Sequence, residues 1–323
     1  MRLVMMGTGA FAEPTFTALL AGTHPVVGLV TNPDRPSGRE RDTLRGMKKI
    51  ALEHAVPVFQ PESVNTTEGV AGLQAFRPDL LVVAAYGQIL SRDVLAVPAH
   101  GGINVHASLL PRYRGAAPVA WAIYHGEIRT GATIIRMSVH LDAGDMLAQQ
   151  AVDIGPEETA GDLEARLAPL GARLALESID HITAGTARGM PQDKTQVTRA
   201  PKLTKEHGLI DWARSPEQVR NQIRAMQPWP TAYTFLHRQG QDTLRLILNR
   251  TGRTAVSPPG PPHPAPGSVH IWEGGDNVWV ATGGNGVIEI LELQPAGKRR
   301  MTSAEFLRGH PLRTGDRLGP EAS

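Results

Sequence analysis

Cysteine is absent from the 323 residues of this chain. The absence excludes disulfide bonds, a thiolate nucleophile and cysteine-ligated zinc. A long run of apolar residues is also missing, so we expect no transmembrane helix. The apolar stretch at residues 3–6 is too short for a signal peptide and is expected to form the first strand of the fold. Together these absences favour a cytoplasmic protein that does not bind a membrane.

Metal-binding patterns are missing as well. None of the 12 histidines stands in a His-Glu-x-x-His motif. Asp142 and Asp145 share one turn and could ligate a hard cation, but two acids in a turn are more often simply part of that turn. We therefore expect no metal ion.

The composition is sufficient for two folded domains. A chain of 323 residues exceeds a typical single domain, and 41% hydrophobic residues suffice for real cores. The net charge of +2 is unevenly distributed: residues 1–199 carry 18 Lys and Arg against 20 Asp and Glu, and residues 200–323 carry 15 against 11. The second part is the one to test for nucleic-acid binding, although an excess this small is as often without consequence.

Strand and helix patterns alternate along residues 1–185. The run at 80–85 is apolar on both faces, as a central parallel strand should be. Leucines at helical spacing follow a capping pattern at 159–162. The other expected strands are residues 3–6, 26–31, 102–105, 130–137 and 146–152. This alternation predicts an α/β fold with a doubly wound, mostly parallel, Rossmann-like sheet.

A different pattern begins after residue 185. Residues 186–208 are polar and irregular, which indicates a linker, and Ser215-Pro216 is a good helix start. The second domain, residues 209–323, contains five expected short strands, at 231–236, 244–249, 268–272, 278–282 and 288–293. Five such strands suggest a small OB-like barrel, a fold that commonly binds nucleic acid, although another small β domain fits the pattern equally well.

A glycine turn follows the first strand. Gly7, Gly9 and Ala12 have the spacing of the dinucleotide fingerprint. The match is weak, because Glu13 would oppose a pyrophosphate and Asp34 only loosely meets the position of the expected acid. A tight structural turn is the simpler interpretation, and we assign no nicotinamide cofactor.

The stretch around residues 102–111 holds the best candidates for chemistry. Asn104 and His106 are two apart, so on a strand they project to the same face, just before a loop marked by Pro111. The carboxyl end of a strand is where open α/β sheets bind ligands. His106 alone is more often a structural histidine, and Asn104 beside it makes the two interpretations about equal. Asp142 is the acid that could orient the imidazole.

These three groups suit acyl transfer to an amine. Asn104 can donate an N–H to the oxyanion that develops on the carbonyl. His106 can donate a second hydrogen bond or relay protons near neutral pH, and Asp142 can take part in proton removal. An acyl donor that is already activated requires no nucleophilic side chain. Spacing does not show that the three meet, because Asp142 lies 36 residues past His106.

Several motifs in combination resemble the folate-dependent formyltransferase family. They are Asn104-Val-His106-Ala-Ser108-Leu-Leu-Pro111 with Arg114-Gly-Ala-Ala-Pro118, Leu141-Asp-Ala-Gly-Asp145, and the segment from Val82 to Leu90. Residues 32–39, 202–206, 210–212, 228–230 and 293–298 are similar to further segments of members that act on tRNA. The resemblance therefore covers nearly the whole chain.

The resemblance implies that the formyl group of 10-formyltetrahydrofolate moves to the α-amino group of methionine on initiator methionyl-tRNA. By residue match, the catalytic trio becomes Asn104, His106 and Asp142. The implied folate-binding residues are Ser108, Leu109, Leu110, Pro111, Tyr86, Gly87, Ile89 and Leu90. The implied tRNA contacts are Arg35, Arg39, Arg41, Lys202, Lys205, Lys298 and Arg299. A monomer without a metal is expected, and its C-terminal barrel binds tRNA.

Three other functions stay open at this point. The same chemistry could act on a small amine, either glycinamide ribonucleotide, whose enzymes lack a second domain, or an amino sugar nucleotide. A nicotinamide-dependent oxidoreductase could be built on the Gly7-x-Gly9 turn. A non-catalytic tRNA-binding protein could use the barrel alone. Binding of a folate analogue rather than NAD would separate the first and second of these classes.

Overall fold

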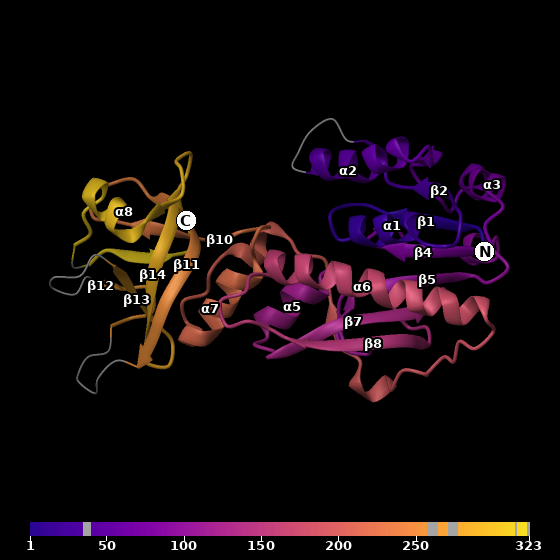
Figure 1. Cartoon of the computed structure of the whole chain (residues 1–323). Coiled ribbons are helices and arrows are strands. Elements are labelled where there is room, and N and C mark those ends of the chain that lie inside the picture. Colours follow the sequence, from indigo (N-terminus) through magenta and orange to yellow (C-terminus); the bar gives the residue numbers. More distant parts are fainter. Residues whose placement is uncertain (35–39, 257–263, 271–276, 314, 322–323) are drawn as a thin grey trace. The chain divides into compact units, whose positions relative to one another are not determined.

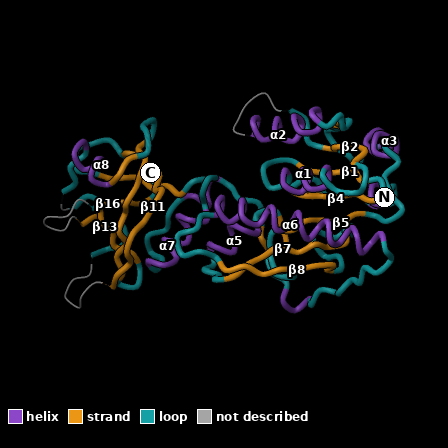
Figure 2. The backbone as a smooth tube through the Cα atoms, in the orientation of Figure 1, coloured by secondary structure: helices purple, strands orange, loops and turns teal. Residues whose placement is uncertain are grey.

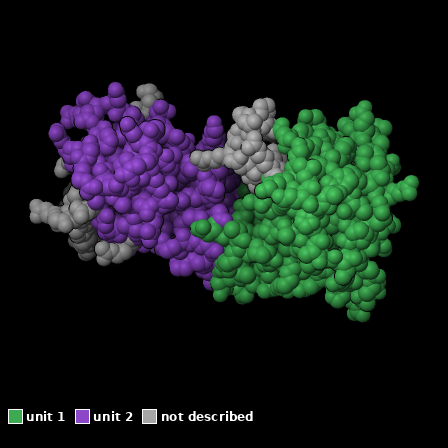
Figure 3. Space-filling model, turned by 45° about the horizontal axis from the view of Figure 1, so that its top comes forward, with its two compact units in different colours: residues 1–119, 129–153, 162–202 green, residues 120–128, 154–161, 203–323 purple. Residues whose placement is uncertain are grey.

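The chain folds into two compact units in a computed structural model (Figure 1). The structure describes residues 1–34, 40–256, 264–270, 277–313 and 315–321. The first unit consists of residues 1–119, 129–153 and 162–202, and the second of residues 120–128, 154–161 and 203–323 (Figure 3). No helix in these described ranges is both long and apolar enough to span a membrane.

A seven-stranded sheet forms the centre of the first unit, in the order β3-β2-β1-β4-β5-β7-β8. Five neighbouring strands run parallel: β1 (Leu3–Gly7), β2 (Val26–Val30), β3 (Val58–Phe59), β4 (Leu80–Ala84) and β5 (Gly102–His106). Two antiparallel strands, β7 (Arg129–Arg136) and β8 (Met146–Asp153), extend the sheet beyond β5. The predicted doubly wound, mostly parallel sheet is confirmed.

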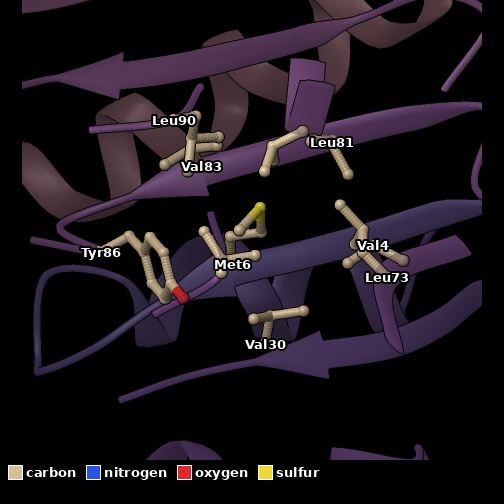
Figure 4. Close-up of a cluster of buried hydrophobic side chains, with 10 residues drawn as sticks. Val4, Met6, Val30, Leu73, Leu81, Val83, Tyr86 and Leu90 are labelled. Atoms are coloured by element: carbon tan, nitrogen blue, oxygen red, sulfur yellow. The ribbon is translucent and has the colours of Figure 1, made fainter. Parts of the chain in front are cut away.

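Helices cover both faces of this sheet. They are α1 (Glu13–Leu20), α2 (Glu40–Glu53), α3 (Thr67–Ala75), α4 (Arg92–Leu95) and α6 (Ala160–Thr183) (Figure 2). Helix α5 (Pro118–Tyr124) begins at the end of a first-unit segment, and its residues 120–124 belong to the second unit. A Cβ at Gly171 of α6 would overlap the side chain of Val105, so α6 packs closely on that face of β5. On the opposite face, Val4, Leu81 and Val83 pack with Leu73 of α3 and with α4 (Figure 4).

Apolar side chains on both faces explain why these strands lie in the middle of the sheet. All five residues of β1 and of β4 are buried. Each fully buried Val or Leu contributes roughly 1.5–3 kcal/mol relative to an exposed one. Thr66 caps α3 by accepting the N–H of Gly69, and Pro14 occupies the first turn of α1, where its missing N–H costs nothing.

The second unit is a nearly closed antiparallel barrel, as predicted. Its strands are β10 (Ala232–His237), β11 (Leu244–Val256), β12 (Val269–His270), β13 (Val278–Thr282), β14 (Gly286–Pro295), β15 (Met301–Thr302) and β16 (Arg317–Gly319). The edge beside β12 is joined to β16 by Val269 N–H to Asp316 O, 3.2 Å, and by Leu318 N–H to Gly267 O, 2.7 Å. These bonds satisfy backbone groups that an open sheet would leave unpaired.

The expected number of five barrel strands was wrong. Strands β15 and β16 have two and three residues, too few to show a period of two, and α8 (Ser303–Gly309) lies between them. The last residues of the predicted strand 268–272 lie outside the described part of the chain. The predicted helix start at Ser215 is confirmed: its hydroxyl accepts the N–H of Gln218 at the beginning of α7 (Pro216–Ala225).

Candidate active site

Strand β5 presents Asn104 and His106 on one face, as their spacing predicts. Asn104 stands opposite Val83 of β4 and Ile135 of β7, and His106 stands opposite Thr133. This is the face away from α6, because the intervening Val105 packs against that helix. Only 5% of His106 is exposed, so its ring nitrogens need protein partners or a bound group.

Asp142 reaches both of these side chains from the loop between β7 and β8. Its Oδ1 accepts a hydrogen bond from Asn104 Nδ2 at 3.3 Å, and its Oδ2 lies 3.6 Å from His106 Nδ1. Oδ2 also accepts the backbone N–H of Gly115 at 2.9 Å. The carboxylate is 8% exposed. The structure therefore brings the three predicted residues together around one carboxylate.

The contact of His106 Nε2 indicates which ring nitrogen carries the proton. Nε2 lies 2.9 Å from the carbonyl oxygen of Tyr113, which can only accept, so Nε2 carries a hydrogen. In the neutral ring the lone pair is then on Nδ1, facing Asp142. Tyr113 has φ +62°, and its N–H is held by Thr198 Oγ1 at 2.8 Å.

The loop after β5 is built from the predicted folate-binding residues 108–111. Ser108 is fully buried and donates its hydroxyl to Arg112 O at 2.7 Å, while Thr133 donates to Ser108 O at 2.6 Å. Leu110 is buried against Ile135 and Met146, and Leu109 and Pro111 are half-buried. These hydrogen bonds and apolar contacts hold the loop in place directly after His106.

The segment after β4 holds the other predicted folate-binding residues. Tyr86 and Leu90 belong to the buried cluster of Figure 4. Met137, at the start of the Asp142 loop, is partly buried and packs against this cluster. Burial raises the pKa of the Tyr86 hydroxyl to about 12. Gly87 is exposed with φ +82°, and Ile89 is 62% exposed. The segment thus lies on the same face of the sheet as Asn104, with an apolar side chain open to solvent.

The structure describes only some of the predicted tRNA contacts. Arg35 and Arg39 lie outside the described residues, and of Arg41 only its position at the start of α2 is described. Lys202, Lys205, Lys298 and Arg299 are exposed. Arg299 donates to Glu305 Oε1 at 2.7 Å.

Sequence reasoning missed the groups that hold Asp142. Gln192 Nε2 donates to the carbonyl oxygens of Asp142 and Gly144, both at 2.8 Å. Arg114 holds the other end of the Gln192 amide. Burial lowers the pKa of Arg114, and so does the nearby Arg199, whereas Asp142 acts in the opposite direction. No sequence motif marked Gln192, which stands in a polar segment without periodicity.

The Gly7 turn has a structural explanation. A Cβ at Gly7 would come within 2.8 Å of both Ala12 Cβ and the Ala84 carbonyl oxygen. Thr8 and Thr31 join the ends of β1 and β2 through their hydroxyls at 3.1 Å. Close packing therefore requires this glycine without any nucleotide.

Comparisons with known proteins give one consistent family. Residues 1–179 match the formyl transferase family, and residues 202–311 match the formyl transferase C-terminal domain. The methionyl-tRNA formyltransferase of Geobacter sulfurreducens is 43% identical over 325 residues, covering 100% of this chain and 98% of that protein.

Solved structures share the fold at low identity. An N-formyltransferase from Helicobacter canadensis, in complex with folinic acid and dTDP-3-aminofucose, has a TM-score of 0.64 at 16% identity, over 90% of this chain and 98% of that one. HypX from Aquifex aeolicus, in complex with tetrahydrofolic acid, has a TM-score of 0.58 at 18% identity, over 99% of this chain and 51% of that one. Taken with the full-length match, the predicted family is confirmed: the chain belongs to the methionyl-tRNA formyltransferase family of folate-dependent formyltransferases.

Proposed function

We propose that this protein transfers the formyl group of 10-formyltetrahydrofolate to the α-amino group of methionine on initiator methionyl-tRNA. The observation that carries the proposal is the convergence of Asn104, His106 and Asp142 on one face of β5. In this proposal, residues 1–185 form the catalytic domain, residues 186–208 the linker, and residues 209–323 the tRNA-binding domain.

Asn104 is proposed to stabilise the negative charge that develops on the formyl oxygen. A carboxamide has two N–H donors, and one of them is directed at Asp142 Oδ1. The second is suited to the substrate oxygen. Because the Asp142 contact already orients the amide, little reorganisation is needed as charge develops.

His106 and Asp142 are proposed to receive the proton that the attacking amine must lose. Nε2–H is directed at Tyr113 O, so Nδ1 is the ring atom that gains or releases a proton, beside Oδ2 of Asp142 at 3.6 Å. The carboxylate stabilises a positive charge on the ring. The amine nitrogen attacks the formyl carbon directly, the bond between that carbon and N10 breaks, and tetrahydrofolate leaves as N10 takes up the proton that the amine has lost. No nucleophilic side chain is required, because the donor supplies an already activated formyl group.

A folate site on this face is supported by its exposed apolar side chains. Ile89 is 62% exposed, and Val139 and Leu141 in the Asp142 loop are 43% and 44% exposed. Isolated exposed apolar residues are common, but these flank a polar site on one sheet face, and flat heterocyclic rings bind between apolar side chains. We propose that residues 86–90 and 108–111 shape this site.

The activity is tested by mixing the protein with 10-formyltetrahydrofolate and charged initiator tRNA, followed by detection of formylmethionine. Methionine on an elongator tRNA serves as the matched acceptor control, and a dTDP-linked amino sugar tests the small-amine alternative. We expect transfer to the initiator tRNA. Transfer to the amino sugar with none to methionyl-tRNA would reassign the acceptor, and binding of NAD in place of folate would remove the chemistry proposed here.

Lys298→Ala is expected to weaken initiator tRNA binding and to reduce the slope of log Kd against log salt concentration by about one, because one phosphate contact releases about one counterion. The same is expected of Arg39→Ala. Filter binding at several salt concentrations measures both. Arg173→Ala removes an exposed cation outside the proposed contacts and serves as the control. A slope unchanged in Lys298→Ala would exclude that lysine from the interface.

A further inference from the structure

A short segment crosses both loops that hold the proposed catalytic residues. Met190 exchanges two backbone hydrogen bonds with Met146, both 2.9 Å, at the end of the Asp142 loop. Arg199–Ala200 (β9) pairs in parallel with Arg114–Gly115 (β6), in the loop after β5. We call residues 190–200 the strap. One end of the strap is therefore joined by backbone hydrogen bonds to the end of the Asp142 loop, and the other end to the loop after β5.

Gln192 is the strap residue that contacts the Asp142 loop between these ends. Its Nε2 donates to Asp142 O and to Gly144 O, each at 2.8 Å, so both amide hydrogens are used on one turn. Its Oε1 accepts from Arg114 Nε at 3.1 Å and from Nη2 at 2.7 Å. Because a guanidinium can only donate, Arg114 determines which end of the amide faces the loop.

The backbone of Asp142 needs such support. Its φ of +48° lies in the left-handed region, which a non-glycine residue occupies only where its surroundings hold it. The Gly115 N–H fixes the carboxylate, and Gln192 fixes the carbonyl oxygen of the same residue. The strap also supports His106 through Tyr113. Thr198 of the strap accepts the N–H of Tyr113, and the carbonyl oxygen of Tyr113 accepts from His106.

We propose that Gln192, oriented by Arg114, is a positioning residue that holds the Asp142 loop in the conformation that presents its carboxylate to His106 and Asn104. The inference rests on the proposed function of Asp142. It extends that function to a segment that the sequence indicated only as a linker, and it gives the strap a direct part in the rate of formyl transfer.

Two substitutions of Gln192 test the inference. Gln192→Ala removes all four hydrogen bonds, whereas Gln192→Glu keeps the size and the acceptor for Arg114 but places a carboxylate oxygen against two carbonyls. Both are expected to lower kcat roughly 10- to 100-fold, because a shift of about 1 Å at a reacting group has such an effect. KM for either substrate is expected to change less than about threefold. Gln196→Ala is the matched control, since Gln196 lies in the same strap and, among the residues that the structure describes, its side chain bonds to Asp193 rather than to the Asp142 loop.

A double substitution shows whether Gln192 acts through Asp142. In an Asp142→Ala background, Gln192→Ala is expected to lower kcat by less than about twofold, because the carboxylate it positions is gone. An equal fold-loss in both backgrounds would overturn the inference. Parental kcat in both Gln192 variants, with a large loss in Asp142→Ala, would also overturn it and leave the proposed function intact. Parental kcat in Asp142→Ala would instead refute the proposed function.

Folding is measured on the same preparations. The lost hydrogen bonds are expected to lower the Tm of both Gln192 variants modestly, whereas their affinity for tetrahydrofolate is expected to stay close to that of the parent. A fall of Tm, folate affinity and kcat together in Gln192→Glu counts against the inference, because a residue needed only for the fold would behave in that way.

Discussion

Asp142→Ala is expected to lower kcat for formyl transfer by at least about 100-fold, with tRNA affinity unchanged within about twofold. The carboxylate is the group that Asn104, His106 and Gly115 share, so its removal disturbs the oxyanion donor and the proton acceptor together. General acid–base catalysis by one positioned group contributes about 10²–10⁴-fold. His106→Ala should show a loss of similar size. The double variant should be little worse than either single one, because the two residues act as a unit.

Single-turnover kinetics with bound initiator tRNA measures this loss, and the Kd for the tRNA is measured in parallel. Asp145→Ala and His140→Ala are the matched controls, since both residues are exposed and lie in the same loop as Asp142. The control variants should keep kcat within about threefold. Equal losses in kcat and in tRNA affinity for Asp142→Ala would mean that the site is misassigned.

Gly144→Ala is expected to lower kcat on the order of 10- to 100-fold and to destabilise the protein by about 1–3 kcal/mol. A Cβ at this position would overlap the carbonyl oxygen of Arg136, the last residue of β7, and would come within 2.9 Å of its carbonyl carbon. Neither atom can move without distorting the strand, so the loop must shift. The shift would reach Asp142, two residues away, and the Gly144 carbonyl that Gln192 holds.

Thermal unfolding and steady-state kinetics of the Gly144→Ala enzyme test this expectation. Gly309→Ala is a suitable control, because nothing lies within 4 Å of its Cβ position. The control should leave kcat unchanged. A Gly144→Ala enzyme with parental kcat would show that the loop can move without loss of activity. That result would contradict the proposal that formyl transfer requires the Asp142 carboxylate to stay in its present position.

The pattern of apolar residues was sufficient to predict the order of the main helices and strands along the chain. Residues 80–84 are buried on both faces of the sheet, and their continuous apolar composition already indicated a central parallel strand. The alternation of side chains along β5 likewise placed Asn104 and His106 on one face without knowledge of the neighbouring strands. The short strands β15 and β16 escaped prediction, because their pairing depends on bonds to distant residues such as those between Leu318 and Gly267.

By itself, then, the sequence determined the α/β class of the first part of the chain, the barrel character of the second part and the common face of Asn104 and His106, and it offered Asp142 as a candidate partner. Only the tertiary structure decided that Asp142 meets them, that the His106 proton sits on Nε2 and that Gln192 supports the Asp142 turn. The physical reason is the range of the interactions. Periodicity reports burial along one segment, whereas these contacts join residues 7 to 50 positions apart through hydrogen bonds that have no local signature.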